Sequence, residues 1–287
     1  MGREPAARRG ARAGNPLLRV PGPALFGILN VTPDSFSDGG DFLDPGAAAR
    51  QADVLLDEGA DVVDVGGEST RPGSDPVSEK EEQRRVVPVV REILRTRPGA
   101  LVSVDTYRAG TAEAALEAGA RIVNDVTALR GDPRMARLVA DVGCPVVLMH
   151  MLGEPKTMQR EPRYEDVTLE VRDFLVRRAE HATAAGVKEE NIILDPGIGF
   201  GKTSEHNLTL LARLSEIAAL GFPVLLGASR KRFLGGITGA ERAKDRVFGT
   251  VATTVLGYER GATLFRVHDV GANREALAVA EAVRNAP

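Results

Sequence analysis

Polar residues follow most of the short apolar runs in this sequence, at the points where buried β-strands would end. They are Asn30, Asp64, Glu68, Asp105, Asn124, Asp125, His150, Asp195, Ser229, Lys231, Arg266 and His268. Two carboxylates held together away from water are costly unless a cation or a ligand compensates them, and Lys231 is a candidate counter-ion for Asp105 and Asp195. With Asn124, these groups offer the donors and acceptors that a flat, amide-containing heterocycle requires. The sequence therefore predicts a small-molecule pocket.

A second group of residues suits a phosphate. Arg266 and His268 end the last apolar run, just before a predicted helix. A guanidinium, an imidazole and the N–H groups of a helix N-terminus can all bind phosphate oxygens. Two polar loops, 30–40 and 66–73, have the Gly, Pro and hydroxyl content of loops that cover an anion, and the second contains Arg71. We therefore expect a site for a phosphate-containing anion.

Helix capping is the plainer explanation for any single Asp or Asn after a strand. Capping does not account for the whole set. The side chains of a strand alternate between its two faces, so Asn124 must lie opposite Asp125, and Asp105 must share a face with Ser103. This alternation separates residues that point into a pocket from residues that cap helices.

The segment DPGIGFGK, residues 195–202, is rich in glycine. It lacks the GxxxxGK[ST] spacing of a P-loop, so a nucleotide-binding loop of that kind is excluded. We expect its glycines to let the backbone and Phe200 approach a ring closely.

Eight β-branched runs alternate with longer stretches of helical spacing, rich in Ala, Leu, Glu and Arg. The runs are 25–31, 61–67, 101–106, 121–126, 145–150, 191–197, 223–229 and 263–269. Alternating strands and helices predict a parallel sheet, and eight units match a single (β/α)8 TIM barrel with its active site at the C-terminal strand ends. An open doubly wound sheet ranks lower, because no GxGxxG follows the first strand and no linker marks a second domain.

Composition and charge exclude several classes of protein. The chain has 287 residues, 43% of them hydrophobic, and a formal net charge of −3, so it lacks the basic field of a nucleic-acid or membrane-surface protein. The single Cys144 excludes an intrachain disulfide. No apolar run approaches the roughly 20 residues of a spanning helix. We expect a cytoplasmic protein with a disordered leader at 1–16 and one catalytic domain at 17–287.

Eight motifs occur in this order between about Leu25 and Asn273: ILNVTPDSFSDGG, DVGGESTRPG, SVDT, NDV, LMHM, DPGIGFGK, SRK and RVHDV. They resemble the motifs of dihydropteroate synthase, a pterin-binding TIM-barrel family. The resemblance implies a transferase of folate biosynthesis that joins 6-hydroxymethyl-7,8-dihydropterin diphosphate to 4-aminobenzoate and releases diphosphate. It also implies Mg²⁺, sulfonamide inhibitors and a homodimer. The apolar helix expected from Val247 suits the dimer face.

The same resemblance implies roles for individual residues. The pterin would contact Asp105, Asn124, Val126, Met149, Asp195, Phe200, Lys231 and Arg266. The diphosphate would contact Asn30, Thr70, Arg71, Arg266 and His268, and Asn30 would also bind Mg²⁺. The 4-aminobenzoate would contact Phe36, Thr70, Arg71, Pro72, Phe200, Lys231 and Arg232. Many relatives have a Ser at position 232 that contacts the 4-aminobenzoate carboxylate, and Arg232 could replace that contact.

The implied chemistry needs no strong general base. Asp105, Lys231, Arg266 and His268 would act as catalytic groups by stabilising charge, and the arylamine, already a neutral nucleophile, needs placement more than deprotonation. Two alternatives stay open. One is a pterin-binding methyltransferase domain that acts with a corrinoid partner. It would bind no diphosphate, and four cationic or imidazole side chains together argue against it: Arg71, Lys231, Arg266 and His268. The other is a non-catalytic or altered-substrate paralogue.

Overall fold

The structure is a computed structural model that describes residues 15–32, 44–69, 75–154 and 156–287. Eight parallel strands lie within these ranges. They are β1 (Ala24–Asn30), β2 (Val62–Gly66), β3 (Val102–Asp105), β4 (Ile122–Asp125), β5 (Val146–Met149), β6 (Ile192–Asp195), β7 (Leu225–Leu226) and β8 (Leu264–Val267). Each lies in one of the eight predicted runs, with β1 shifted by one residue. The predicted number and order of strands are therefore confirmed.

The strands form a nearly closed barrel. Their order in the sheet is β6-β5-β4-β3-β2-β1-β8-β7, and every pairing is parallel. An isolated parallel bridge between Leu194 and Val224 joins the two ends of this order. There, the backbone N–H of Leu194 donates to the carbonyl oxygen of Pro223 over 2.9 Å. The barrel prediction is confirmed, and an open doubly wound sheet is excluded.

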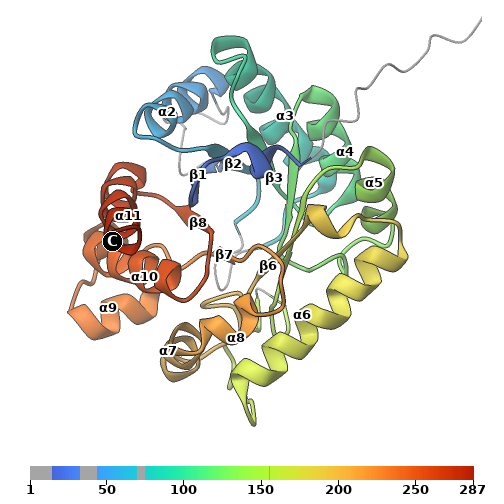
Figure 1. Cartoon of the computed structure of the whole chain (residues 1–287). Helices are drawn as coiled ribbons and strands as arrows, with labels where there is room; N and C mark the ends of the chain where they lie inside the picture. The colour runs from blue at the N-terminus through green and yellow to red at the C-terminus, as the bar shows by residue number, and fades with distance from the viewer. Residues whose placement is uncertain (1–14, 33–43, 70–74, 155) are drawn as a thin grey trace, which may run out of the picture.

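A ring of helices surrounds the strands (Figure 1). The α-helices are α2 (Pro45–Asp57), α3 (Glu79–Thr96), α4 (Ala109–Ala118), α5 (Met135–Val142), α6 (Val167–Ala184), α7 (Ser204–Ala212), α8 (Leu214–Ala218), α9 (Arg232–Thr238), α10 (Val247–Glu259) and α11 (Val270–Arg284). Short 3₁₀ helices are η1 (Pro16–Arg19), η2 (Glu189–Asn191) and η3 (Ala243–Arg246). Side-chain caps fix some helix starts: Ser78 accepts from the N–H of Glu81, and Asp166 accepts from those of Thr168 and Leu169.

Strand alternation divides the core into two parts. The outward residues of the strands pack under the helices in one large apolar cluster. The inward residues fill the barrel with a smaller cluster: Ala24, Phe26, Val62, Ile122, Val147, Ile193, Leu225 and Leu264. Two residues further along four of these strands stand Asp64, Asn124, Asp195 and Arg266, on the same inward face. The barrel is therefore apolar inside and polar at its C-terminal mouth.

The described part of the chain begins with packed residues. Asn15 is buried, and its side chain donates to the carbonyl oxygen of Glu190 over 2.6 Å and accepts from the N–H of Leu17. Asn15 therefore packs with the barrel and Pro16 begins η1, although the expected leader included both; its other residues, 1–14, lie outside the described residues. Cys144 is buried and forms no disulfide, and burial raises the pKa of its thiol to about 12. Within the described residues, no helix is long and apolar enough to cross a membrane.

Candidate functional site

Arg266 lies at the centre of the polar barrel mouth. Its Nε donates to Asp64 Oδ2 over 2.6 Å, and its Nη2 donates to Asp105 Oδ2 over 2.7 Å. Asn124 Nδ2 donates to the same Oδ2 of Asp64 over 3.2 Å. These side chains come from β8, β2, β3 and β4, so the strand ends bring Asp105 and Asn124 together as the alternation predicted, with Arg266 between the carboxylates.

No role was predicted for Asp64 from the sequence, although its carboxylate accepts hydrogen bonds from both Arg266 and Asn124. Asp64 is fully buried, and its Oδ1 has no hydrogen-bond partner within the described residues. The signal that could have identified it is the same period of two: Asp64 stands two residues after the inward Val62, as Asn124 does after Ile122.

The cluster carries excess negative charge in a poorly solvated place. Burial raises the pKa of Asp105 to about 7; the guanidinium of Arg266 opposes this shift, and the carboxylate of Asp64 adds to it. Burial alone would lower the pKa of Arg266, but Asp64 and Asp105 outweigh burial and raise it, so the guanidinium stays charged. One cation thus faces two carboxyl groups, an arrangement that favours additional positive charge nearby.

Asp195 reaches the mouth from the end of β6. Its Oδ1 accepts from the N–H of Gly197 over 2.7 Å. Burial raises the pKa of Asp195, against the opposing effects of the Gly197 N–H and of Lys231. Gly227, next to β7, leaves space beside this carboxylate: a Cβ at position 227 would lie 3.8 Å from Asp195 Oδ2 and 3.9 Å from Arg266 Cβ. Asp195 and Arg266 therefore border one space.

Lys231 contacts the loop after β6 more closely than it contacts Asp195. Its Nζ donates to the carbonyl oxygen of Ile198 and lies 4.2 Å from the centroid of the Phe200 ring. Burial lowers the pKa of Lys231 to about 7, and Asp195 opposes this shift. Lys231 was predicted from the sequence to be a counter-ion for the carboxylates. In the structure it also makes a cation–π contact with Phe200.

An apolar cluster lies beside these polar groups. Val126, Met149, Met151 and Met158 are buried together, with Phe200 and Tyr107 packed against them. Met149 pairs in register with Asp195. Val126, Met149 and Phe200, three residues expected at a flat ring, therefore belong to one cluster, and Met149 is the strand neighbour of the aspartate expected to bind the ring edge.

His268 follows β8 and is linked to the loop after β7. Its backbone N–H donates to Ser229 Oγ over 3.1 Å, and its Nδ1 lies 3.0 Å from the same oxygen. The next residues in both loops also pair, because Arg230 Nε donates to Asp269 Oδ2 over 2.9 Å. His268 is thus held two residues before α11, close to the helix N-terminus where the sequence predicted it.

Two further residues assigned to the site lie at the ends of secondary-structure elements, and four lie outside the described residues. Asn30 is the last residue of β1 and is half-buried. Arg232 is exposed and is the first residue of α9. Phe36, Thr70, Arg71 and Pro72 lie outside the described residues. Within the described part, no group of three or more His, Cys, Asp or Glu side chains could hold a metal ion.

Two polar strand-end residues have structural partners instead. Asp125 points away from the mouth and accepts from the N–H groups of Thr127 and Leu129, which is the turn-stabilising role that alternation implies. Glu68 accepts from Nη2 of Arg108 over 2.8 Å, and so joins the end of β2 to the start of α4. Capping and loop bracing therefore account for these two carboxylates.

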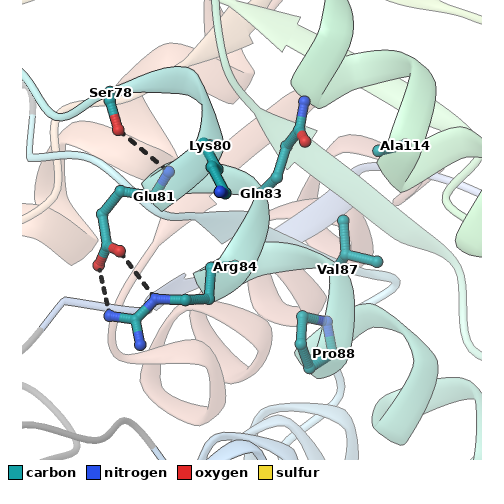
Figure 2. Close-up of a pocket in the computed structure, with 8 residues that line it drawn as sticks. All are labelled: Ser78, Lys80, Glu81, Gln83, Arg84, Val87, Pro88 and Ala114. Atoms are coloured by element: carbon teal, nitrogen blue, oxygen red, sulfur yellow. Dashed lines mark hydrogen bonds and ion pairs between the residues drawn. The ribbon is translucent and has the colours of Figure 1, made fainter.

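A hollow on the outside of the barrel is a different feature. It encloses about 510 Å³ and is lined mainly by α3, with one residue from α4 (Figure 2). Three of its polar residues are paired with one another: Ser78 accepts from the N–H of Glu81, and Glu81 Oε2 accepts from Nε of Arg84 over 2.8 Å. We assign no function to this hollow.

Residues 26–268 match the family described as pterin binding enzyme. The dihydropteroate synthase of Haemophilus influenzae is 43% identical over 274 residues, which cover 96% of this chain and 98% of the relative.

Two solved structures give the same result. The Xanthomonas albilineans dihydropteroate synthase with 4-aminobenzoic acid has a TM-score of 0.87 at 48% identity, covering 92% of this chain and 94% of that chain. The Yersinia pestis dihydropteroate synthase in a sulfonamide drug complex has a TM-score of 0.87 at 44% identity, covering 92% of this chain and 95% of that chain. At this identity and coverage, the similarity extends to the strand ends that carry the polar cluster.

Proposed function

The chain belongs to the family of pterin binding enzymes, and we propose that the polar cluster at its barrel mouth is the active site of a dihydropteroate synthase. The enzyme condenses 6-hydroxymethyl-7,8-dihydropterin diphosphate with 4-aminobenzoate and yields 7,8-dihydropteroate and diphosphate. The observation that carries the proposal is the convergence of Asp64, Asp105, Asn124 and Arg266 in a chain similar to dihydropteroate synthases over almost its whole length.

In this proposal the pterin lies in the space that Asp195 and Arg266 border. The free oxygen of Asp195 would accept N–H groups from the ring edge, since its other oxygen binds Gly197. Asn124 and Asp105 would contact the rest of that edge. Val126, Met149 and Phe200, with Lys231 beyond them, would border the ring through the apolar cluster and the cation–π pair described above.

The diphosphate would lie between Asn30 and the end of β8. Arg266 and His268 would bind its oxygens, with Thr70 and Arg71 from outside the described residues. For Mg²⁺, Asn30 offers one amide oxygen, and that suits an ion that takes most of its ligands from substrate phosphates and water. Bound there, Mg²⁺ would help neutralise the leaving group.

The 4-aminobenzoate would bind beside Phe200 and Lys231. Phe36, Thr70, Arg71 and Pro72 would complete this pocket, and Arg232 would contact the carboxylate. Because the Yersinia pestis relative was solved with a sulfonamide drug, we expect sulfonamides to compete with 4-aminobenzoate here.

The charges at the mouth suit a transfer step in which diphosphate leaves before the amine bonds to the methylene carbon. Arg266 and His268 would offset the negative charge on the departing oxygens. Asp64 and Asp105 would stabilise the positive charge left on the ring, because they already outnumber the one guanidinium between them. The neutral arylamine attacks the methylene carbon without a strong general base, and the proton that its nitrogen then loses passes to water or to the released diphosphate.

We further propose a homodimer and a cytoplasmic location. Phe248 on α10 is 84% exposed, and Leu256 on the same helix is 48% exposed. Val279 and Val283 on α11 are exposed as well, and the two helices lie side by side (Figure 1). An apolar surface of this kind is typical of a contact between subunits.

A direct assay tests the proposed function. Purified protein is mixed with the pterin diphosphate, labelled 4-aminobenzoate and Mg²⁺, and dihydropteroate and diphosphate are measured together. A non-catalytic paralogue would bind ligands without forming product. A methyltransferase domain would bind the pterin but would not distinguish the diphosphate from the alcohol. If folded protein forms no dihydropteroate, the proposal is wrong.

A further inference from the structure

Lys202 is a buried lysine whose amine points into its own loop. The residue is 3% exposed. Its Nζ lies 2.9 Å from the carbonyl oxygen of Gly197, 3.0 Å from that of Phe200 and 2.9 Å from His150 Nδ1. Within the described residues, no carboxylate lies at ion-pair distance from this amine. Burial lowers the pKa of Lys202 well below its usual range, and these three acceptors surround its amine.

The loop that follows β6 is wound closely around this amine. Gly197 has φ of 67°, and a Cβ there would overlap the carbonyl oxygen of His150. Gly199 has φ of 81°, and a Cβ there would lie 2.8 Å from Lys231 Cδ. These glycines were predicted to let the loop approach a ring. They also let the loop backbone lie close to the end of β5 on one side and to Lys231 on the other.

Three residues of the proposed site depend on this loop. Asp195 Oδ1 accepts from the N–H of Gly197. Lys231 Nζ donates to the carbonyl oxygen of Ile198 and lies over the ring of Phe200. A change in the shape of residues 196–201 would therefore move an acceptor for the pterin and two residues of the 4-aminobenzoate pocket together.

We propose that Lys202 and His150 are positioning residues, and that their contact fixes the loop that places Phe200 and Lys231 for 4-aminobenzoate. This inference rests on the proposed function. Lys202 touches no reacting atom, because the loop's carbonyl oxygens and His150 occupy its amine. His150 takes part as an acceptor: burial lowers the pKa of its imidazole to about 2, so the ring is neutral and Nδ1 can accept while Nε2 carries the proton.

Two variants remove the contact from opposite sides. Lys202→Met keeps the length and apolar bulk of the side chain and removes its donors. His150→Leu removes the acceptor. We expect each to raise KM for 4-aminobenzoate by about tenfold, the effect of one lost buried hydrogen bond. We expect kcat to fall less, because the cluster around Arg266 does not contact this loop directly.

A matched variant distinguishes positioning from general support of the fold. His150→Asn keeps an acceptor near the place of Nδ1, so KM for 4-aminobenzoate should return to within about threefold of the unmodified protein. A purely structural role would lower the melting temperature and the active fraction, and hence kcat, with KM unchanged in all variants. Such a result overturns the inference, as does a His150→Asn variant with the same raised KM as His150→Leu.

The unmodified protein is assayed in the same series. If it forms no dihydropteroate, the proposed function fails, whereas an active protein whose variants keep their KM contradicts only the role of Lys202. If Lys202→Met does not fold, the comparison of His150→Leu with His150→Asn decides alone. A crystal structure of His150→Leu should show residues 197–200 displaced, and an unchanged loop would count against the inference.

Discussion

The guanidinium of Arg266 is bound to Asp64 through Nε and Oδ2, 2.6 Å apart, and this bond joins the inward ends of β8 and β2. Nη2 of the same guanidinium binds Asp105 on the neighbouring β3. Because two carboxylates hold two different nitrogens, they set the plane of the guanidinium as well as its position. The orientation of Arg266, which we propose to contact both the ring and the diphosphate, therefore depends on Asp64.

Asp64→Asn should reduce catalysis. The amide keeps the size of the carboxyl group but removes the charge that holds Arg266 Nε, so we expect kcat/KM for the pterin diphosphate to fall about 10²-fold. A loss of about 1–3 kcal/mol in the free energy of unfolding should accompany it, from the altered buried hydrogen bonds. Steady-state kinetics and chemical denaturation measure the two effects.

Asp125→Asn is the matched control for Asp64→Asn. Asp125 is also a fully buried strand-end aspartate, but it faces outward and stabilises a turn. This variant should lose stability with kcat/KM nearly unchanged. Equal kinetic losses in both variants would show that the effect of Asp64 comes from the fold alone.

Asp105→Asn should lower turnover more than it weakens pterin binding. The carboxylate of Asp105 would stabilise the cation formed when diphosphate leaves, whereas the amide can still accept a hydrogen bond from the ring. We expect kcat to fall at least tenfold, with the dissociation constant of the pterin changed less than threefold by calorimetry. Equal losses in kcat and affinity would contradict this role.

Asp105 should also affect how stability varies with pH. Its folded-state pKa of about 7 lies above the value of about 3.9 for an unfolded aspartate, so the folded protein binds more protons between these values. The contribution of Asp105 to the free energy of unfolding therefore falls as pH rises from 4 to 7 and is constant at higher pH. The melting temperature of Asp105→Asn minus that of the unmodified protein should therefore be larger at pH 8 than at pH 5, by at least roughly 3 °C. A constant difference would show that the pKa of Asp105 is not raised.

The inward strand ends were predictable because one physical rule governs them. Alternation with a period of two placed Asp105, Asn124 and Asp195 on the face that encloses the barrel interior, and the structure brings them to one mouth. The same rule applies to Asp64, which was overlooked because no single chemical role distinguished it from Glu68 nearby. The alternation identifies the strand face on which a residue lies. Only the residue's partner, here Arg266, identifies its role.

The loops were harder to predict, because their shape depends on tertiary contacts. A lysine after a glycine-rich stretch is usually exposed, so nothing in the sequence indicated that Lys202 would be buried against His150. Lys231 was predicted to belong to the strand-end group, but its partners, the Ile198 carbonyl and the Phe200 ring, depend on how the loop after β6 folds back.

Phe248→Asp should convert the proposed dimer into a monomer. A charge placed at this exposed apolar position would be desolvated in an interface, at a cost of several kcal/mol. Analytical ultracentrifugation should show a twofold drop in mass for this variant and no change for Val142→Asp, an exposed valine at the end of α5, away from α10. A monomeric unmodified protein, or a Phe248→Asp dimer, would rule out this face as the interface.

Gly227→Ala should weaken pterin binding without weakening the fold. The added methyl would meet Asp195 Oδ2 and Arg266 Cβ at ordinary contact distances, so it fits the apoprotein but fills space assigned to the ring. We expect KM for the pterin diphosphate to rise about tenfold, with the melting temperature equal to or above that of the unmodified protein, because alanine restricts the unfolded chain. Gly236→Ala, where a Cβ meets nothing within 4 Å, should leave KM unchanged. If Gly227→Ala binds pterin as tightly as the unmodified protein does, the ring does not lie between Asp195 and Arg266.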